Sequence, residues 1–155
     1  MSIPNEKIIR KKAIIEAKKT TSSLTQFELL NFEEFDSDWL ISFEDQLQLF
    51  RKLDSNPTFT NANINKDEVS EWIINSLDFL KNKKEFSIII PNTSYPVWAN
   101  VKVEDLIKGI TELLKMSVSN ELSIADKSSA TIAQIYSEEK GYEIHIGKVK
   151  TDYEG

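Results

Sequence analysis

The spacing of apolar residues along the chain predicts two helices in its first third. The first covers residues 1–22, although the pair Ile14-Ile15 also suits a strand. The second begins at the capping candidates in residues 36–38 and ends before Asn56-Pro57, because the residue preceding a proline disfavours helical backbone. The apolar stripes that define them are Ile9, Ala13 and Ala17 in the first helix, and Leu40, Phe43, Leu47, Phe50 and Leu53 in the second.

Two further helices are predicted in the middle of the chain. Asn65 is a good N-cap, and Glu68 completes a capping-box pattern before an apolar stripe that reaches residue 80. The next helix covers residues 103–114 and contains Gly109, which costs about 1 kcal/mol relative to alanine in a helix interior. We interpret this glycine as a point of close approach to another element. The two stripes are Val69, Trp72, Ile73, Ser76, Leu77 and Leu80, and then Val103, Leu106, Ile107, Ile110, Leu113 and Leu114.

Shorter apolar segments predict strands, most of them in the last third of the chain. The segment that stops at Pro91 has the composition of a buried central strand, and residues 91–100 after it are predicted to form a loop. The final two strands are joined by residues 138–141, a hairpin loop in which Gly141 supplies a positive φ. The predicted strands are residues 25–32, 86–90, 122–125, 131–137 and 142–149.

These elements predict an α+β fold. Residues 1–155 form a single domain, in which about four helices pack on one face of a mostly antiparallel sheet of four or five strands. A β-hairpin closes the fold, and the tail at 150–155 is expected to fray. The predicted core is Leu40, Phe43, Leu47, Phe50, Val69, Trp72, Ile73, Leu77, Leu80, Ile88, Ile90, Leu106, Ile107, Ile110, Leu114, Ile132, Ile144 and Ile146.

Charge is distributed unevenly over this fold. The net charge is −6, with +4 in residues 1–20, −9 in residues 21–80 and −1 in residues 81–155. An acidic middle repels nucleic acid and attracts basic partners, although a solvated surface alone would also account for it. The basic N-terminal helix is too scattered in charge to predict nucleic-acid or lipid binding, and it could instead pack against the acidic middle of its own fold.

The acidic residues concentrate in one segment. Seven acidic residues and no basic residue lie in residues 28–45. We predict a partner-binding surface there, with a solvated helix start as the alternative. Its residues are Glu33, Glu34, Asp36, Asp38, Glu44 and Asp45, with Trp39 as an apolar anchor. Tyr95 and Trp98, in the proline-flanked loop, form a secondary candidate surface, because exposed tyrosine and tryptophan are enriched at binding hot spots. Capping of a core edge is the alternative for these two.

Residue types needed for common chemistries are scarce. The chain has no cysteine and one histidine, and its four glycines build no dinucleotide-binding or phosphate-binding loop. His145 lies on the polar face of the last predicted strand and is expected to be a surface or partly buried residue rather than a catalytic base. We therefore expect no catalytic residue, no metal site and no cofactor.

Three hypotheses of function are compatible with the sequence. The first is a non-enzymatic, cytosolic protein that sequesters a basic protein partner, most concretely an immunity protein or antitoxin that neutralises a bacterial nuclease toxin. The alternatives are an acidic secretion chaperone that binds an effector segment as a dimer, and a small enzyme that depends on carboxylates or on His145. No secretory signal, membrane span or cysteine is visible, so the cytosol is the expected compartment. The sequence leaves the oligomeric state open.

Overall fold

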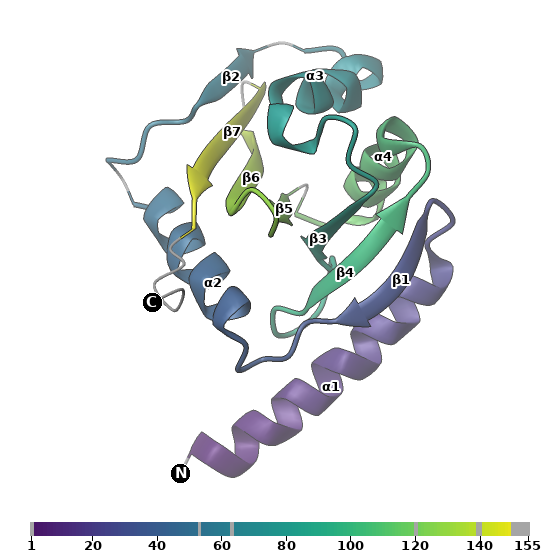
Figure 1. Ribbon diagram of the computed structural model, residues 1–155, viewed down its shortest axis with the longest axis vertical. Helices are drawn as coiled ribbons and strands as arrows, with labels where there is room; N and C mark the ends of the chain where they lie inside the picture. The colour runs from purple at the N-terminus through teal and green to yellow at the C-terminus, as the bar shows by residue number, and fades with distance from the viewer. Residues whose placement is uncertain (1, 53, 63, 120, 139–140, 150–155) are drawn as a thin grey trace.

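The computed structural model describes residues 2–52, 54–62, 64–119, 121–138 and 141–149. Within them, seven strands form one antiparallel sheet in the order β1-β4-β3-β5-β6-β7-β2 (Figure 1). The strands are β1 (Phe27–Phe32), β2 (Phe59–Ala62), β3 (Glu85–Ile89), β4 (Trp98–Val103), β5 (Leu122–Asp126), β6 (Thr131–Glu138) and β7 (Gly141–Lys148). The α-helices are α1 (Ser2–Ser23), α2 (Asp38–Phe50), α3 (Val69–Ser76) and α4 (Leu106–Met116), with short 3-10 turns η1 (Lys66–Glu68) and η2 (Asp78–Leu80).

Helices cover both faces of this sheet. Side chains alternate along each strand, so Ala99 of β4 and Ile124 of β5 face one way while their neighbours Trp98 and Ala125 face the other. The first face packs against α1, α3 and α4 in the larger apolar core. The second face packs against α2 in a smaller core that includes Ile132 of β6. The α+β class is confirmed, but the expectation that all four helices share one face is wrong.

The sheet has more strands than the four or five predicted. Strand β4 lies in and beyond the segment predicted as a loop, and Val103, assigned to a helix stripe, is its last residue. The residues do carry a strand pattern, because Ala99, Val101 and Val103 alternate with Asn100 and Lys102. The pattern begins at Trp98, whose side chain is buried on the second face of the sheet. Strand β2 was missed because it is a four-residue edge strand, Phe-Thr-Asn-Ala, without a buried side chain.

The predicted helix signals are largely confirmed. Ser37 caps α2 by accepting a hydrogen bond from the Leu40 backbone N–H at 3.1 Å. Asn65 caps η1 through the Asp67 N–H at 3.3 Å, but the single helix expected after it is divided into η1, α3 and η2. Helix α2 ends at Phe50, earlier than predicted, and Leu53 and residues 150–155 lie outside the described residues. Among the described helices, none is both long enough and apolar enough to cross a membrane.

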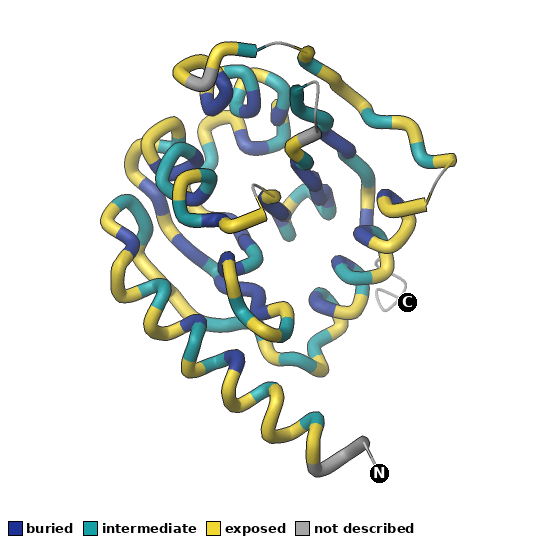
Figure 2. The backbone as a smooth tube through the Cα atoms, turned by 180° about the vertical axis from the view of Figure 1, so that it is seen from behind, coloured by how far each residue is buried: buried dark blue, intermediate teal, exposed yellow. Residues whose placement is uncertain are grey.

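Most of the predicted core is buried. Thirteen of its eighteen residues are buried, and Trp72, Leu106, Leu114 and Ile146 are half-buried at its edge. Ile107 is 47% exposed, so its assignment to the core is wrong. Figure 2 shows the same division along the chain, with buried segments in the sheet and alternating buried and exposed turns in the helices. The N-terminal part of α1 extends past the sheet (Figure 1), and on this helix Ala13 and Ala17 are fully buried.

The two glycines singled out in the sequence occupy constrained positions. Gly141 has φ of 140°, in the region expected for the hairpin. An added Cβ at Gly109 would lie 2.8 Å from the Phe27 ring and 2.9 Å from Val103 Cγ2. Helix α4 therefore approaches β1 and β4 closely at Gly109, which confirms the interpretation of this glycine as a packing position.

We predict that Gly109→Ala destabilises the protein. Alanine would raise helix propensity by about 1 kcal/mol, but the methyl group collides with Phe27 and Val103, and overpacking costs about 1–3 kcal/mol. The melting temperature should therefore fall by a few degrees. Lys108→Ala, an exposed position one residue earlier, is the control and should change it little. A higher melting temperature for Gly109→Ala would contradict the assignment of Gly109 as a position of close packing.

Candidate functional site

Helix α2 presents a mixed acidic and apolar stripe to solvent. Asp38, Ile41, Asp45 and Leu49 follow one another at helical spacing on the side opposite the buried stripe. Ile41 is 50% exposed and Leu49 is 45% exposed. We call these four residues the outer face of α2. An aliphatic centre flanked by charges resembles the composition of a protein–protein interface.

The opposite side of α2 is fixed to the sheet. Phe43 and Trp98 are both fully buried, and their ring centroids lie 4.7 Å apart. Trp98 Nε1 also donates a hydrogen bond to Glu44 Oε1 at 3.2 Å. Trp39 stacks beside Phe43 at 5.7 Å. These contacts hold the helix in one orientation, so the outer face is presented by a rigid support.

The structure changes the predicted role of two aromatic residues. Trp98 was expected on an exposed loop, but it is the first residue of β4 and is 0% exposed, so it cannot belong to a binding surface. Its side chain points to the second face because strand residues alternate. Trp39 is half-buried against the α2 core, and Tyr95 is half-buried against Phe35, with ring centroids 5.6 Å apart. The core-edge alternative therefore describes Tyr95 well.

The predicted acidic cluster is not one uniform patch. Four of its six carboxylates are exposed: Glu34, Asp36, Asp38 and Asp45. Glu44 is half-buried on Trp98, as described above. Glu33 is half-buried and forms an ion pair with Lys127, and its Oε1 also accepts a hydrogen bond from Asn100 Nδ2 at 3.1 Å. Glu33 and Glu44 therefore stabilise the fold, and the other four carboxylates are exposed to solvent.

Glu33 is held in its charged form by these contacts. Burial would raise the pKa of its carboxyl group, but hydrogen bonds from Lys127 and Asn100 outweigh the burial and lower the pKa below its ordinary value. Lys127 is 94 positions away in the sequence and belongs to the turn between β5 and β6. The pair thus ties the segment before α2 to the turn between two central strands of the sheet, a role that sequence reasoning missed.

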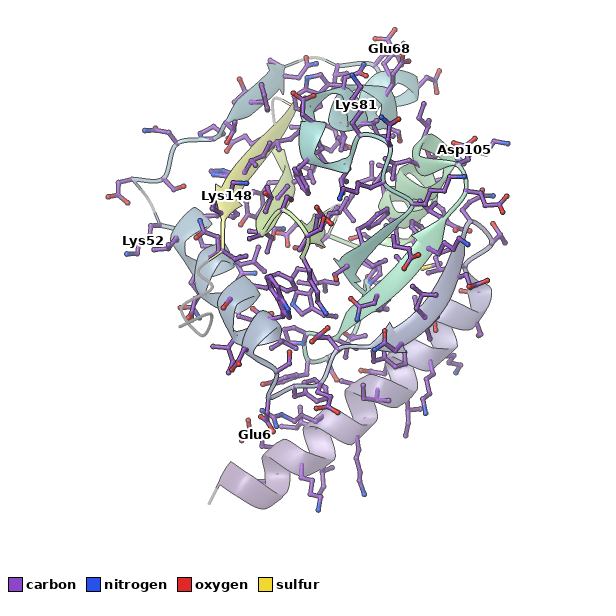
Figure 3. All side chains as sticks on the ribbon, viewed as in Figure 1. Glu6, Lys52, Glu68, Lys81, Asp105 and Lys148 are labelled. Atoms are coloured by element: carbon purple, nitrogen blue, oxygen red, sulfur yellow. The ribbon has the colours of Figure 1, made fainter. Side chains whose placement is uncertain are left out.

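The basic helix α1 does contact the acidic segment. Arg10 lies 3.4 Å from Asp36 and 3.1 Å from Glu6 on its own helix. Its guanidinium also lies over the Phe35 ring, 5.0 Å from the centroid, and 5.9 Å from that of Tyr95. Figure 3 shows Glu6 at the lower end of the molecule, near the start of α1. Asp36 is therefore partly neutralised within the chain. Of the six carboxylates of the predicted surface, this leaves Glu34, Asp38 and Asp45 exposed and without an ion pair among the described residues.

A second group of polar residues lies buried on the second sheet face. Ser87 donates to Asn100 Oδ1 at 2.6 Å, and Ser123 donates to Gln134 Oε1 at 2.6 Å. Each pair joins adjacent strands at the same register position. Buried polar groups are costly unless hydrogen-bonded, so both pairs are satisfied locally. The sequence signal for these pairs is the alternation of apolar and polar residues along strands β3 to β6. This alternation directs the polar side chains to the second face of the sheet.

His145 belongs to this second face and is more buried than predicted. It is 5% exposed, because the Phe50 ring at the end of α2 and the Tyr136 ring on β6 each lie 5.6 Å from it. Nδ1 lies 3.3 Å from Ser55 Oγ, and Nε2 lies 3.5 Å from Glu143 Oε1. Serine, histidine and glutamate are the residue types of a hydrolase triad, but the two rings leave a substrate little access to this imidazole. Among the described residues, no three His, Asp or Glu side chains group as a metal site would require.

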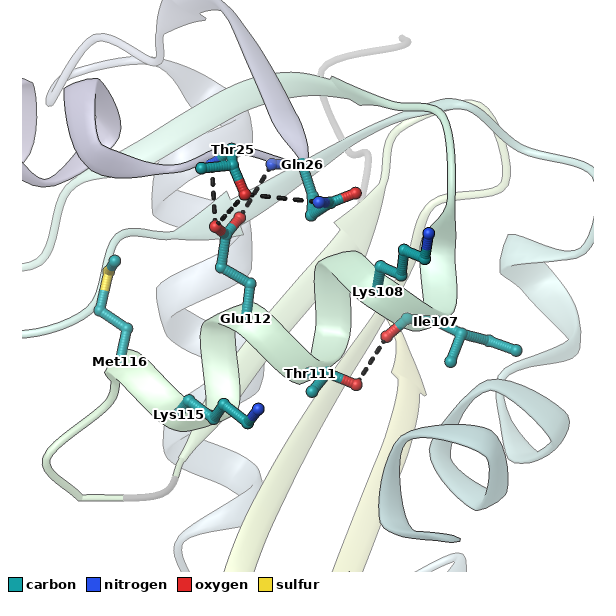
Figure 4. A pocket seen from close by; sticks show the side chains of 8 residues that line it. All are labelled: Thr25, Gln26, Ile107, Lys108, Thr111, Glu112, Lys115 and Met116. Atoms are coloured by element: carbon teal, nitrogen blue, oxygen red, sulfur yellow. Dashed lines mark hydrogen bonds between the residues drawn. The ribbon is translucent and has the colours of Figure 1, made fainter. Parts of the chain in front are cut away.

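A groove of about 530 Å³ lies beside α4 (Figure 4). Its central carboxylate, Glu112, accepts hydrogen bonds from the Thr25 N–H at 2.8 Å, the Thr25 hydroxyl at 2.7 Å and the Gln26 N–H at 3.0 Å. Burial would raise the pKa of Glu112, but these three hydrogen bonds outweigh it and lower the pKa. Glu112 thus joins α4 to the connection from α1 to β1, and both of its carboxylate oxygens accept hydrogen bonds from that connection.

We predict that Glu112→Gln makes the protein less stable at neutral pH and less sensitive to acid. A carboxylate whose folded-state pKa is lowered stabilises the fold above its ordinary pKa of 4.5, and this contribution is lost as the pH falls through the folded-state value. Because Glu112 is partly exposed, the loss at pH 7 should be about 1 kcal/mol. Urea unfolding at pH 7 and at pH 3 measures both effects. Glu104→Gln, an exposed carboxylate, is the control; equal pH dependence in all three proteins would contradict the assignment.

Comparisons with known proteins give no relative from which a function could be carried over. No protein-family model, no curated protein and no solved structure matches this chain. Function is therefore inferred from the residues described above. Of these, the outer face of α2 has the exposed charged and apolar groups that a partner can contact, whereas the carboxylates of Glu33 and Glu112 are engaged inside the fold.

Proposed function

We propose that this protein binds a basic protein partner through the outer face of α2 and the adjoining Glu34. The observation that carries the proposal is the alternation of exposed carboxylates, Asp38 and Asp45, with the exposed aliphatic side chains Ile41 and Leu49 on one helix. Aliphatic side chains gain free energy when a partner covers them, and flanking charges select the sign of that partner.

The support beneath this surface favours binding without rearrangement. The four buried side chains of α2 are Leu40, Phe43, Leu47 and Phe50. Because they fix the helix on the sheet, association does not have to pay for ordering it, and preorganised surfaces bind more tightly for the same contact area. The Glu33–Lys127 ion pair fixes the loop before the helix in the same way.

The negative charge of this part of the chain supports a positively charged partner. Residues 21–80 have a net charge of −9, and the exposed carboxylates of this surface belong to that segment. Such a field accelerates encounter with a cationic surface and weakens with added salt. The concrete form that we propose is a non-enzymatic, cytosolic immunity protein or antitoxin, whose acidic helix occludes the basic nucleic-acid-binding site of a bacterial nuclease toxin.

We predict that the triple variant Asp38→Asn, Ile41→Ala, Asp45→Asn loses this partner. Removing the two charges should slow association and reduce its salt dependence, and truncating Ile41 should weaken the affinity about tenfold. The measurement is capture from a lysate of the source cell at low and high salt, with the bound protein identified by mass and its affinity then determined by calorimetry.

The matched control is the pair Glu71→Gln and Glu104→Gln, which removes two exposed charges from other parts of the chain. A single basic protein held in stoichiometric amount by the wild type and by the control, and released by the triple variant, is the expected result. Equal capture by the triple variant, or no captured protein with the wild type at either salt concentration, would contradict the proposal.

A further inference from the structure

A small polar cavity opens beyond the C-terminal end of α2. Its volume is about 190 Å³, equal to about six water molecules at their share of the liquid. Its walls come from the segment after β3, the segment between α4 and β5, and the first residue after α2. The cavity is separate from the outer face of α2, since none of the four residues of that face lines it.

The floor of the cavity is the buried pair Ser123 and Gln134. Ser123 is 5% exposed and Gln134 is 1% exposed, and both side chains line the cavity. Among the described residues, the Gln134 amide makes one hydrogen bond, with Ser123. One half of the amide therefore remains for a further partner, whichever way its oxygen and nitrogen are assigned. Gln134 lines the cavity, so water or a ligand in the cavity can bind this half of the amide.

The wall above this floor is held in place by Asn92. Its side chain donates to the Met116 carbonyl at 2.7 Å and accepts from the Val118 N–H at 3.0 Å, so it ties the end of β3 to the segment after α4. Asn92 has φ of 65°, a left-handed conformation that asparagine tolerates. Ser117 is buried beside it and lines the cavity. The cavity is thus formed by fixed elements.

Opposite charges stand at the mouth. Arg51 and Glu121 both line the cavity and are both exposed. A guanidinium binds a carboxylate, a carboxylate binds an ammonium group, and the buried amide and hydroxyl supply neutral hydrogen bonds beneath them. A molecule that carries one positive and one negative charge and fills the volume of about six water molecules has the size of a free amino acid.

We propose that this cavity binds a small zwitterion of the free amino acid class. Arg51 contacts its carboxylate, Glu121 contacts its ammonium group, and the side chain reaches the amide of Gln134. The site is independent of the protein-binding surface proposed above, because no residue is shared between them.

The test is calorimetric titration of the full-length protein with each of the twenty free amino acids up to about 10 mM. The variants are Arg51→Gln at the mouth and Gln134→Leu at the floor, where leucine is close in volume and removes only the polar group. Lys52→Gln is the matched control: it removes the neighbouring charge, which projects outward from the molecule (Figure 3) and does not line the cavity.

Saturable binding of at least one amino acid, weakened about tenfold or more in Arg51→Gln and Gln134→Leu and unchanged in Lys52→Gln, is the expected result. No saturable binding to the wild type would overturn the proposal, as would unchanged affinity in Arg51→Gln, an exposed position that does not threaten folding. The melting curve of Gln134→Leu shows whether this variant folds. Because leucine leaves the buried Ser123 hydroxyl without its partner, a fall of a few degrees is expected, and binding is compared at a temperature at which the variant is folded.

Discussion

The contact between Phe43 and Trp98 is the interaction on which the second face of the sheet depends. Both side chains are fully buried with ring centroids 4.7 Å apart, and the indole N–H is satisfied by Glu44 of the same helix. Burying large apolar side chains contributes about 1.5–3 kcal/mol each. This contact therefore does more than add stability, because it fixes where α2 crosses the strands. The outer face of α2 is directed to solvent as a direct consequence.

The position of α2 also explains why the rest of the second face is polar. Under the helix the strands carry apolar side chains such as Ala125 and Ile132. At neighbouring register positions lie the hydrogen-bonded pair of Ser123 with Gln134 and the buried His145, which contacts Phe50 at the end of the helix. Helix α2 has thirteen residues and covers only part of the second face of the seven-stranded sheet. The cavity beside Arg51 lies at that boundary, where burial and hydrogen-bonding capacity occur together.

The sequence predicted what is local. Helical stripes and the caps Ser37 and Asn65 depend on residues within one or two turns of the same helix. The packing role of Gly109 follows from its lack of a side chain. The division of helices between two faces could not be predicted, because helix periodicity shows that a face is buried without showing which surface buries it. Trp98 lies two residues after Pro96 and two residues before Asn100, and this composition suggested a loop although Trp98 is fully buried at the start of β4.

The predicted site shows the same limit. The concentration of acid in residues 28–45 was visible in the sequence, but the separation of its members was not. Lys127 engages Glu33 across 94 positions, and Arg10 engages Asp36 across 26. Such pairings depend on the fold and cannot be inferred from charge counts. What the structure leaves exposed is a smaller surface in which Ile41, absent from the predicted site, lies between Asp38 and Asp45.

The proposed function requires α2 to be a rigid support that offers its outer face to a partner. Hydrogen–deuterium exchange of the protein alone and in complex with its captured partner tests this claim most directly. We expect slow exchange in α2 of the free protein, since its amides are hydrogen-bonded within a helix that is packed on the sheet, and further protection on binding that centres on residues 34–50. Fast exchange of α2 in the free protein, or new protection confined to α1, α4 or the edge strand β2, would contradict the account.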